Sequence, residues 1–220
     1  GGRQTCTISR NGDLIHKVYV QMEAVTTSAL NLANPGYNQF DSIELEIGGQ
    51  RIDKQPGSFM AAWAELTQSN PTGETVAANA AIVNEAWTLF QKTTLSGGVT
   101  ANGAAFNAGT ASSYFVPLQF WFCRNAGLAL PLIALQYHEV KINLNYTSTA
   151  WTDRPTTTLW VDYIYLDTDE RRRFAQVSHE YLIEQVQEQS WSSTNTELNF
   201  NHPVKEIVAS QKINFVNNAN

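Results

Sequence analysis

Hydrophobic and polar side chains alternate along much of this chain. Over residues 42–47 the hydrophobic positions are Ile43, Leu45 and Ile47, and the residues between them are polar. Residues 139–146 repeat the pattern, with an apolar or aromatic side chain at every second position. A period of two predicts strands with one face in a core and one face in water, which is typical of antiparallel sheets. Further predicted strands are 5–9, 14–22, 114–122, 130–135 and 159–166.

Glycine and small polar residues separate these strands. Asn11-Gly12-Asp13 predicts a hairpin between the first two strands, because Asn and Gly accept positive φ. Gly48-Gly49 ends the strand over 42–47 in the same way. Residues 70–113 are rich in Ala, Gly, Thr and Asn and predict a long connection that serves as a contact surface.

Two short helices are predicted between the strands. Ser58 is expected to cap a helix over 59–67. Asp167 and Glu170 form a pair resembling a capping box, ahead of a helix over 171–177. Many strands, few helices and no regular strand–helix alternation favour an all-β fold, an antiparallel jelly-roll sandwich with short helical insertions.

Composition narrows the function. Charged residues make up 15% of the chain, against roughly 25% in an ordinary soluble domain. Such a deficit is expected where much of the outer surface is buried against neighbouring subunits. The net charge is −6, and the one basic run, Arg171-Arg172-Arg173, directly follows acidic residues, which argues against direct binding of nucleic acid. The longest nearly apolar stretch, 128–135, is far shorter than the roughly 20 residues of a membrane-spanning helix.

No motif for catalysis, metal or cofactor binding is found. Cys6 and Cys123 lack metal-ligand spacing and predict reduced core thiols, which suits a reducing compartment such as cytoplasm. His138 and Glu139 are adjacent, so they face opposite sides of a strand, and His138 is expected on the Val140 face as a core or interface residue. Asp167-Thr168-Asp169 is expected to favour a helix N-terminus through the helix dipole. We therefore predict a protein that is not an enzyme.

Two features of the sequence are compatible with carbohydrate binding or glycosylation. Alternation over 114–122 predicts Phe120 and Phe122 in the core and Trp121 facing outward, as a subunit contact or a sugar-stacking platform. Asn145, in Asn145-Tyr146-Thr147, is an N-glycosylation acceptor, although such sequons are usually unused in cytoplasmic proteins. Two alternatives to a structural protein therefore stay open. They are a carbohydrate-binding jelly-roll module and a glycoside-cleaving sandwich with two facing carboxylates.

Five segments, in order, resemble signatures of the major capsid proteins of nucleocytoplasmic large DNA viruses. They are residues 5–15, 43–53, 117–140, 167–175 and 200–206. The third is the most specific and begins Pro117-Leu118-Gln119-Phe120-Trp121-Phe122-Cys123-Arg124-Asn125. Ala126 stands where the family often has proline.

The resemblance implies two tandem jelly rolls, of which this sequence holds the first and the opening of the second. The expected domains are a first jelly roll at 1–189 with its N-terminal strand missing, a polar linker at 190–201, and the start of a second jelly roll at 202–220, opening with a strand over 202–208. The resemblance also implies a homotrimer with a pseudo-hexagonal outline that tiles an icosahedral shell around an inner membrane. Minor capsid proteins are the other implied partners, and the implied location is the virion, assembled in the host cytoplasm.

Overall fold

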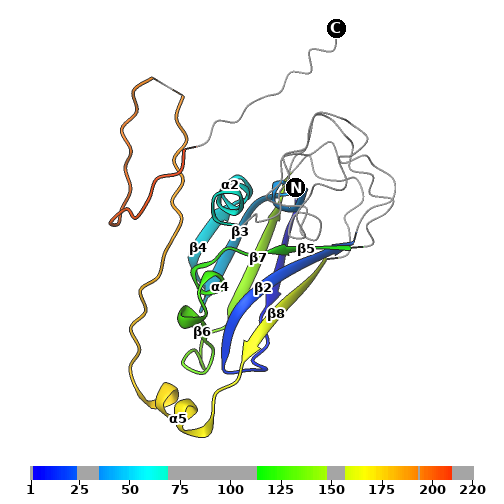
Figure 1. Cartoon of the computed structure of the whole chain (residues 1–220), viewed down its shortest axis with the longest axis vertical. Coiled ribbons are helices and arrows are strands. Elements are labelled where there is room, and N and C mark those ends of the chain that lie inside the picture. The colour runs from blue at the N-terminus through cyan, green and yellow to red at the C-terminus, as the bar shows by residue number, and fades with distance from the viewer. Residues whose placement is uncertain (1, 24–34, 69–112, 148–156, 193, 210–220) are drawn as a thin grey trace. The chain divides into compact units, whose positions relative to one another are not determined.

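The computed structural model describes residues 2–23, 35–68, 113–147, 157–192 and 194–209. The chain divides into two compact units, Gly1–Val186 (unit 1) and Gln187–Asn220 (unit 2). All helices and strands of the described residues belong to unit 1 (Figure 1). None of these helices combines the length and hydrophobicity that crossing a bilayer requires.

One sheet, which we call sheet A, has four antiparallel strands in the order β1-β7-β3-β4. Their bounds are Arg3–Thr7 (β1), Val140–Tyr146 (β7), Phe40–Ile47 (β3) and Gln50–Pro56 (β4). Ile43, Leu45 and Ile142 are fully buried, which confirms the faces predicted from alternation on β3 and β7. Gly48 and Gly49 have φ of 59° and 84° and form the predicted turn after β3. Strand β4, which that turn opens, is absent from the strands that alternation alone predicts.

The second sheet, sheet B, is built around the long strand β2 (Leu14–Glu23). On one side β2 pairs with β5 (Ser113–Pro117) and the two-residue β6 (Leu130–Pro131), and on the other with β8 (Thr157–Ile164), all antiparallel. Among the described residues β8 has no second partner, so it is an edge strand.

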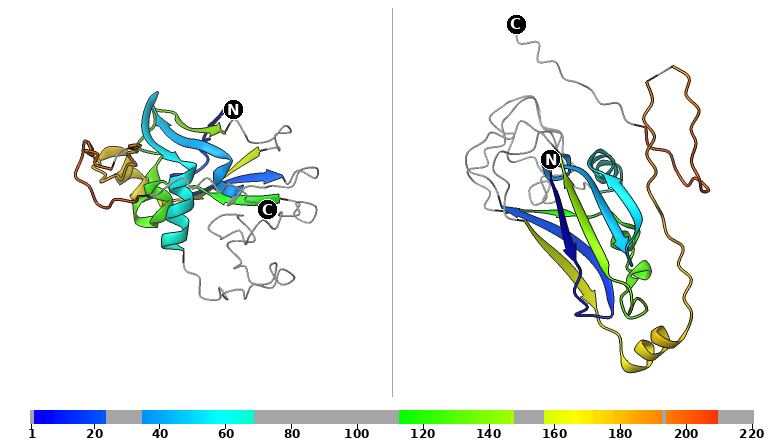
Figure 2. Two further views of the ribbon diagram at one scale, coloured as in Figure 1. Left: turned by 90° about the horizontal axis from the view of Figure 1, so that it is seen from above. Right: turned by 180° about the vertical axis from the view of Figure 1, so that it is seen from behind.

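Sheets A and B lie face to face, and their inner faces form one core (Figure 2). Sheet A contributes the residues named above, and sheet B contributes Val18, Val20 and Met22, each no more than 1% exposed. Burying each such side chain stabilises the fold by about 1.5–3 kcal/mol. The arrangement confirms the predicted all-β antiparallel sandwich with short helices.

The helices are short and their ends differ in how well sequence predicts them. Their bounds are Pro35–Asn38 (α1), Gly57–Thr67 (α2), Trp121–Arg124 (α4), the 3₁₀ helix Ala126–Leu128 (η2) and Thr168–Gln176 (α5). The predicted cap at Ser58 is wrong, because α2 begins two residues earlier than predicted, at Gly57, and its N-cap residue Pro56 has no side-chain cap. The predicted cap of α5 is confirmed, since the Asp167 carboxylate accepts a hydrogen bond from the Glu170 amide at 2.8 Å.

The hairpin predicted at Asn11-Gly12-Asp13 is wrong. Strand β1 pairs with β7 in sheet A and β2 pairs in sheet B, so the connection crosses between sheets. Gly12 is required there for a different reason than positive φ. A Cβ atom on Gly12 would lie 2.6 Å from the Cβ of Tyr163, so only glycine permits this approach of the connection to β8.

Two predicted strands are much shorter in the structure. The strand over 114–122 ends at Pro117, and the chain then turns into α4, so Trp121 is 3% exposed rather than facing outward. Leaving the strand lets consecutive aromatic residues all enter the core, which alternation forbids. The strand over 130–135 is confined to Leu130–Pro131, and the backbone then forms turns, with Ala134 N–H donating to the Pro131 carbonyl. The predicted connection 70–113 lies almost entirely outside the described residues.

Unit 2 has no helix or strand among its described residues. Glutamine side chains organise it instead, with Gln189 donating to the Glu197 carbonyl at 2.8 Å and accepting from the Asn199 amide at 2.9 Å. The strand predicted over 202–208 is not formed. Val204 and Ile207 are 52% and 63% exposed, and the described part of this unit offers no neighbouring strand to satisfy an extended backbone.

Candidate functional site

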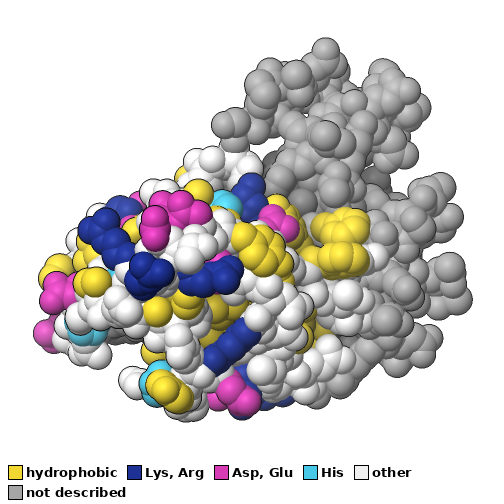
Figure 3. Space-filling view, turned by 90° about the horizontal axis from the view of Figure 1, so that it is seen from below, with side chains coloured by type: hydrophobic (Ala, Val, Ile, Leu, Met, Phe, Trp, Pro, Cys, Tyr) yellow, Lys and Arg dark blue, Asp and Glu magenta, His cyan; other side chains and the backbone are white. Residues whose placement is uncertain are grey.

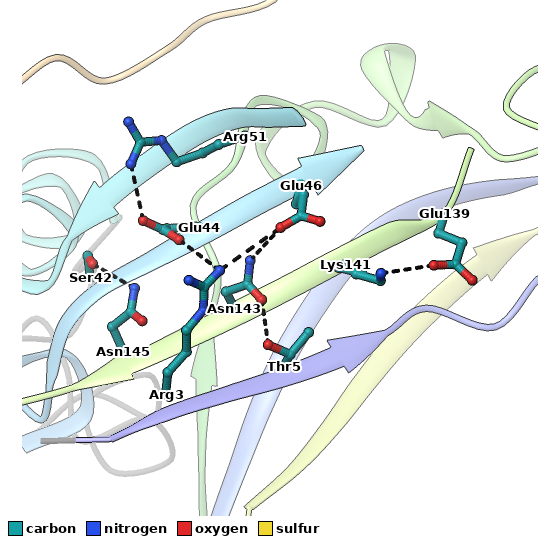
Figure 4. Close-up of polar contacts among 10 residues, drawn as sticks. All are labelled: Arg3, Thr5, Ser42, Glu44, Glu46, Arg51, Glu139, Lys141, Asn143 and Asn145. Atoms are coloured by element: carbon teal, nitrogen blue, oxygen red, sulfur yellow. Dashed lines mark hydrogen bonds and ion pairs between the residues drawn. The ribbon is translucent and has the colours of Figure 1, made fainter. Parts of the chain in front are cut away.

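The outer face of sheet A carries a connected set of polar side chains, which we call the polar lattice (Figure 4). Its members come from all four strands and are Arg3, Thr5, Ser42, Glu44, Glu46, Arg51, Asn143 and Asn145. Alternation places the members from β3 and β7 there, because each of them lies one position from a core residue of its strand. The lattice is the most extensive polar arrangement that the described residues form on one sheet face.

Glu44 is the electrostatic centre of the lattice. One of its carboxylate oxygens lies 3.4 Å from an Arg3 nitrogen and the other lies 3.4 Å from an Arg51 nitrogen. The Glu44 side chain is 11% exposed, whereas the two arginines are 54% and 62% exposed. Glu44 on β3 therefore joins β4 beside it and β1, which lies beyond β7. Because both arginines remain wet, the ion pairs contribute about 0–1 kcal/mol each.

Asn143 fills the middle of the lattice on β7. Its amide oxygen accepts a hydrogen bond from the Thr5 hydroxyl at 2.7 Å, and its amide nitrogen donates to Glu46 at 3.2 Å. At 1% exposure the side chain is out of contact with water, so both ends of its amide need these partners. The lattice thus links the side chains of neighbouring strands across the outer face of sheet A.

Asn145, the predicted glycosylation site, belongs to the same lattice. Its side-chain nitrogen, the atom that a glycan would modify, donates a hydrogen bond to the Ser42 hydroxyl at 3.1 Å. The side chain is half-buried between strands. Glycosylation at Asn145 therefore stays a prediction, and it would require this contact to break.

Two buried carboxylates lie away from the lattice, and sequence reasoning assigned a role to neither. Asp13 accepts hydrogen bonds from Arg171 and from the Leu166 amide, and these contacts lower its pKa. Burial raises the pKa of Asp53, against the opposing effect of hydrogen bonds from backbone and side-chain donors. Asp13 bonds to Leu166 and Asp53 to Val186, each more than a hundred positions away in the sequence, so no local motif signals these contacts.

The remaining candidates serve the fold. His138 is exposed, in the turn before β7, so it is not a core residue, and its alternative place at an interface stays a prediction. Asp167 caps α5, as predicted. Cys6 and Cys123 are free thiols and half-buried, and burial raises the pKa of Cys123 to about 12. No group of three His, Cys, Asp or Glu side chains suited to a metal ion occurs in the described ranges.

Trp121 is not available to stack on a sugar, because it packs edge-on against Phe122 in the core, with ring centroids 5.2 Å apart. Exposed aromatic residues occur elsewhere, at Tyr137, Trp160 and Tyr165. Seen from below, the described surface mixes acidic, basic and hydrophobic side chains without a broad patch of one charge (Figure 3). The face seen in Figure 3 therefore does not show the broad basic patch that favours nucleic-acid binding.

The described residues form an antiparallel sandwich of two sheets, which is the arrangement of jelly-roll proteins. The family described as "Major capsid protein N-terminus" matches residues 1–167. The major capsid protein of Pyramimonas orientalis virus is 49% identical over 228 residues, which cover 96% of this chain and 52% of that protein. The major capsid protein of Paramecium bursaria Chlorella virus 1 is 38% identical over 232 residues, which cover 94% of this chain and 48% of that protein.

A quasi-atomic structure of the PBCV-1 virus capsid has the same fold, with a TM-score of 0.64 and 37% identity over 84% of this chain and 43% of that chain. The chain belongs to the family of viral major capsid proteins, and it corresponds to their N-terminal region. Its relatives are structural components of virions and not enzymes. The chain spans about half the length of the capsid proteins it matches.

Proposed function

We propose that this chain is the N-terminal part of a major capsid protein that forms homotrimers, and that the trimers tile the icosahedral shell of a large DNA virus as pseudo-hexagonal capsomers. The observation that carries the proposal is the match to viral capsid proteins along 96% of the chain. The side-chain contacts across sheet A and the low charge fraction of 15% support it, since a shell subunit needs a well-defined fold and buries much of its surface.

The proposed domains are those expected from the sequence, with a first jelly roll at 1–189, a linker at 190–201 and the start of a second jelly roll at 202–220. Among the described residues β8 pairs only with β2, which supports the view that the first jelly roll lacks its N-terminal strand. Leu159, Val161 and Tyr163 point toward the core from β8 yet stay half-buried, and Cys6 on β1 is half-buried too. A further strand paired to β8 would cover this edge of sheet B and shield these side chains from water.

The proposed partners follow the same reasoning. The chain binds further copies of itself and minor capsid proteins, and it lies close to an inner viral membrane without spanning it. The acidic balance makes direct contact with the genome unfavourable. Assembly takes place in the host cytoplasm, where the two free thiols stay reduced.

The test is the mass of the full-length polypeptide, measured by size-exclusion chromatography with light scattering at moderate ionic strength. We expect three times the chain mass, and we expect salt to promote association of trimers because it screens the repulsion between acidic capsomers. Electron microscopy of the particle fraction from infected cells should detect the same protein in a shell. A stable monomer at high concentration, with no shell that contains the protein, would contradict the proposal. Binding of glycans by that monomer would favour the carbohydrate-binding alternative.

A further inference from the structure

The segment that follows α5 runs extended along unit 1 without joining either sheet. We call residues 178–186 the strap. It begins just after α5, where the His179 ring stacks on Phe174 at 4.8 Å between centroids and bonds to the Phe174 carbonyl. It ends at Val186, the last residue of unit 1. Everything beyond it belongs to the next unit, so the strap is the physical connection between the two.

A buried carboxylate holds the far end of the strap. The Val186 amide donates a hydrogen bond to an Asp53 carboxylate oxygen at 2.9 Å, and the Lys54 amide donates to the same oxygen at 2.9 Å. Gln55 donates to the other oxygen at 2.9 Å. Asp53 is 3% exposed and lies on β4, an edge strand of sheet A. The strap therefore binds β4 through this side chain and not through the backbone pairing of a further strand.

The two residues before Val186 add contacts of their own. Gln185 donates through its side chain to the Ile52 carbonyl, again on β4. Glu184 pairs with Arg124 of α4 at 3.0 Å, and the Arg124 guanidinium lies 4.8 Å from the centre of the Trp63 ring of α2. The Arg124 side chain is 20% exposed, so its guanidinium is better shielded from water than the arginines of the polar lattice, although Glu184 is 35% exposed.

The near end is fixed as well. The Asp13 carboxylate bonds to the Leu166 amide at 2.8 Å and to Arg171 at 2.9 Å, which ties the start of α5 to the connection between β1 and β2. The path from β8 to the end of unit 1 is therefore anchored at both ends. A free chain of nine residues would have a root-mean-square end-to-end distance of about 15–18 Å, and that distance would fluctuate widely.

We propose that residues 178–186 are a docked spacer, with Asp53 as the positioning residue, and that docking sets the point on unit 1 from which the next unit starts. The strap binds a surface formed by β4 and α4, and the bound partner is a segment of the same chain. This inference concerns the folded chain alone, so it stands whether or not the protein assembles into a shell.

The test is amide hydrogen exchange of Val186 in the full chain. In the wild type we expect the Val186 amide to be protected. Asp53→Ala removes its acceptor, so the protection factor should fall at least about tenfold, as expected for a hydrogen bond to a charged group. The matched control is Asp41→Ala, an exposed aspartate on β3 of the same sheet, which should leave Val186 protection unchanged. Protection of the Ile142 amide in the core reports whether each variant is folded.

A second variant keeps the test decisive where Asp53→Ala disturbs folding. Gln185→Ala removes only an exposed side chain and its bond to Ile52, and it should increase both exchange at Val186 and cleavage after Glu184 by a glutamate-specific protease. An unprotected Val186 amide in the wild type would overturn the proposal. Unchanged protection and cleavage in folded variants would overturn it too.

Discussion

Asp13 offers the sharpest test of how tertiary contacts stabilise this fold. Its side chain is 10% exposed and holds two donors, the Leu166 amide at 2.8 Å and Arg171 at 2.9 Å. Arg171 is 52% exposed, so its ion pair contributes only about 0–1 kcal/mol. The hydrogen bond from the amide of half-buried Leu166 to a charged acceptor contributes roughly 1.5–3 kcal/mol. Asp13→Ala should therefore lower the free energy of unfolding by roughly 1.5–4 kcal/mol at neutral pH.

The same contacts predict a sign for the pH dependence. The Arg171 side chain, followed by the Leu166 amide, holds the pKa of Asp13 below its ordinary value. A carboxyl group whose pKa is lower in the folded state stabilises the fold above its unfolded pKa of about 3.9. That stability is lost as the pH falls through the lower folded value. Asp13→Asn cannot titrate, so the gap in stability between wild type and this variant should narrow as the pH falls from 7 toward 2.

Urea unfolding followed by circular dichroism at several pH values measures both effects. The control is Asp169→Asn on α5, the helix that carries Arg171; the Asp169 side chain is 93% exposed and lies 4.0 Å from Arg172. It should change the free energy of unfolding by less than about 0.5 kcal/mol. A gap between wild type and Asp13→Asn that stays constant across this pH range would refute the reasoning, because the carboxylate charge would then contribute nothing.

Three further predictions test the turn, a thiol and the core. Gly48→Ala should lower the free energy of unfolding by more than the ~1–2 kcal/mol expected for a left-handed residue, because its Cβ would also lie 2.6 Å from the His138 ring. The Cβ of Gly49→Ala would meet open space. Adding His138→Ala to Gly48→Ala should restore the part of the free energy of unfolding that the clash removes, as measured by urea unfolding. If stability is not restored, the clash does not exist. Burial raises the pKa of Cys123 to about 12, so iodoacetamide at pH 8 should label it far more slowly in the folded chain than in urea, as mass spectrometry would detect. Ile142→Ala should destabilise the chain by about 2–5 kcal/mol in the same unfolding assay, and a loss below 1 kcal/mol would show that β7 is not central to the core.

The sequence by itself determined the features that depend on near neighbours. Alternation identified the buried faces of β3 and β7, since successive side chains of any strand point to opposite sides. Gly48-Gly49 marked a turn, because few other residues accept positive φ. Asp167 marked the start of α5, because a helix N-terminus needs an acceptor within reach of its first amides.

Only the tertiary structure decided which strands pair and which polar residues meet. Asn11-Gly12-Asp13 is a good local turn, yet it joins two sheets, because β1 and β2 each find better partners far along the chain. Trp121 enters the core because the backbone leaves the strand at Pro117, a change that depends on the space between the sheets. Asp13 and Asp53 bond to amides 153 and 133 positions away. Such contacts form only once the two sheets have packed together, so no pattern of neighbouring residues predicts them.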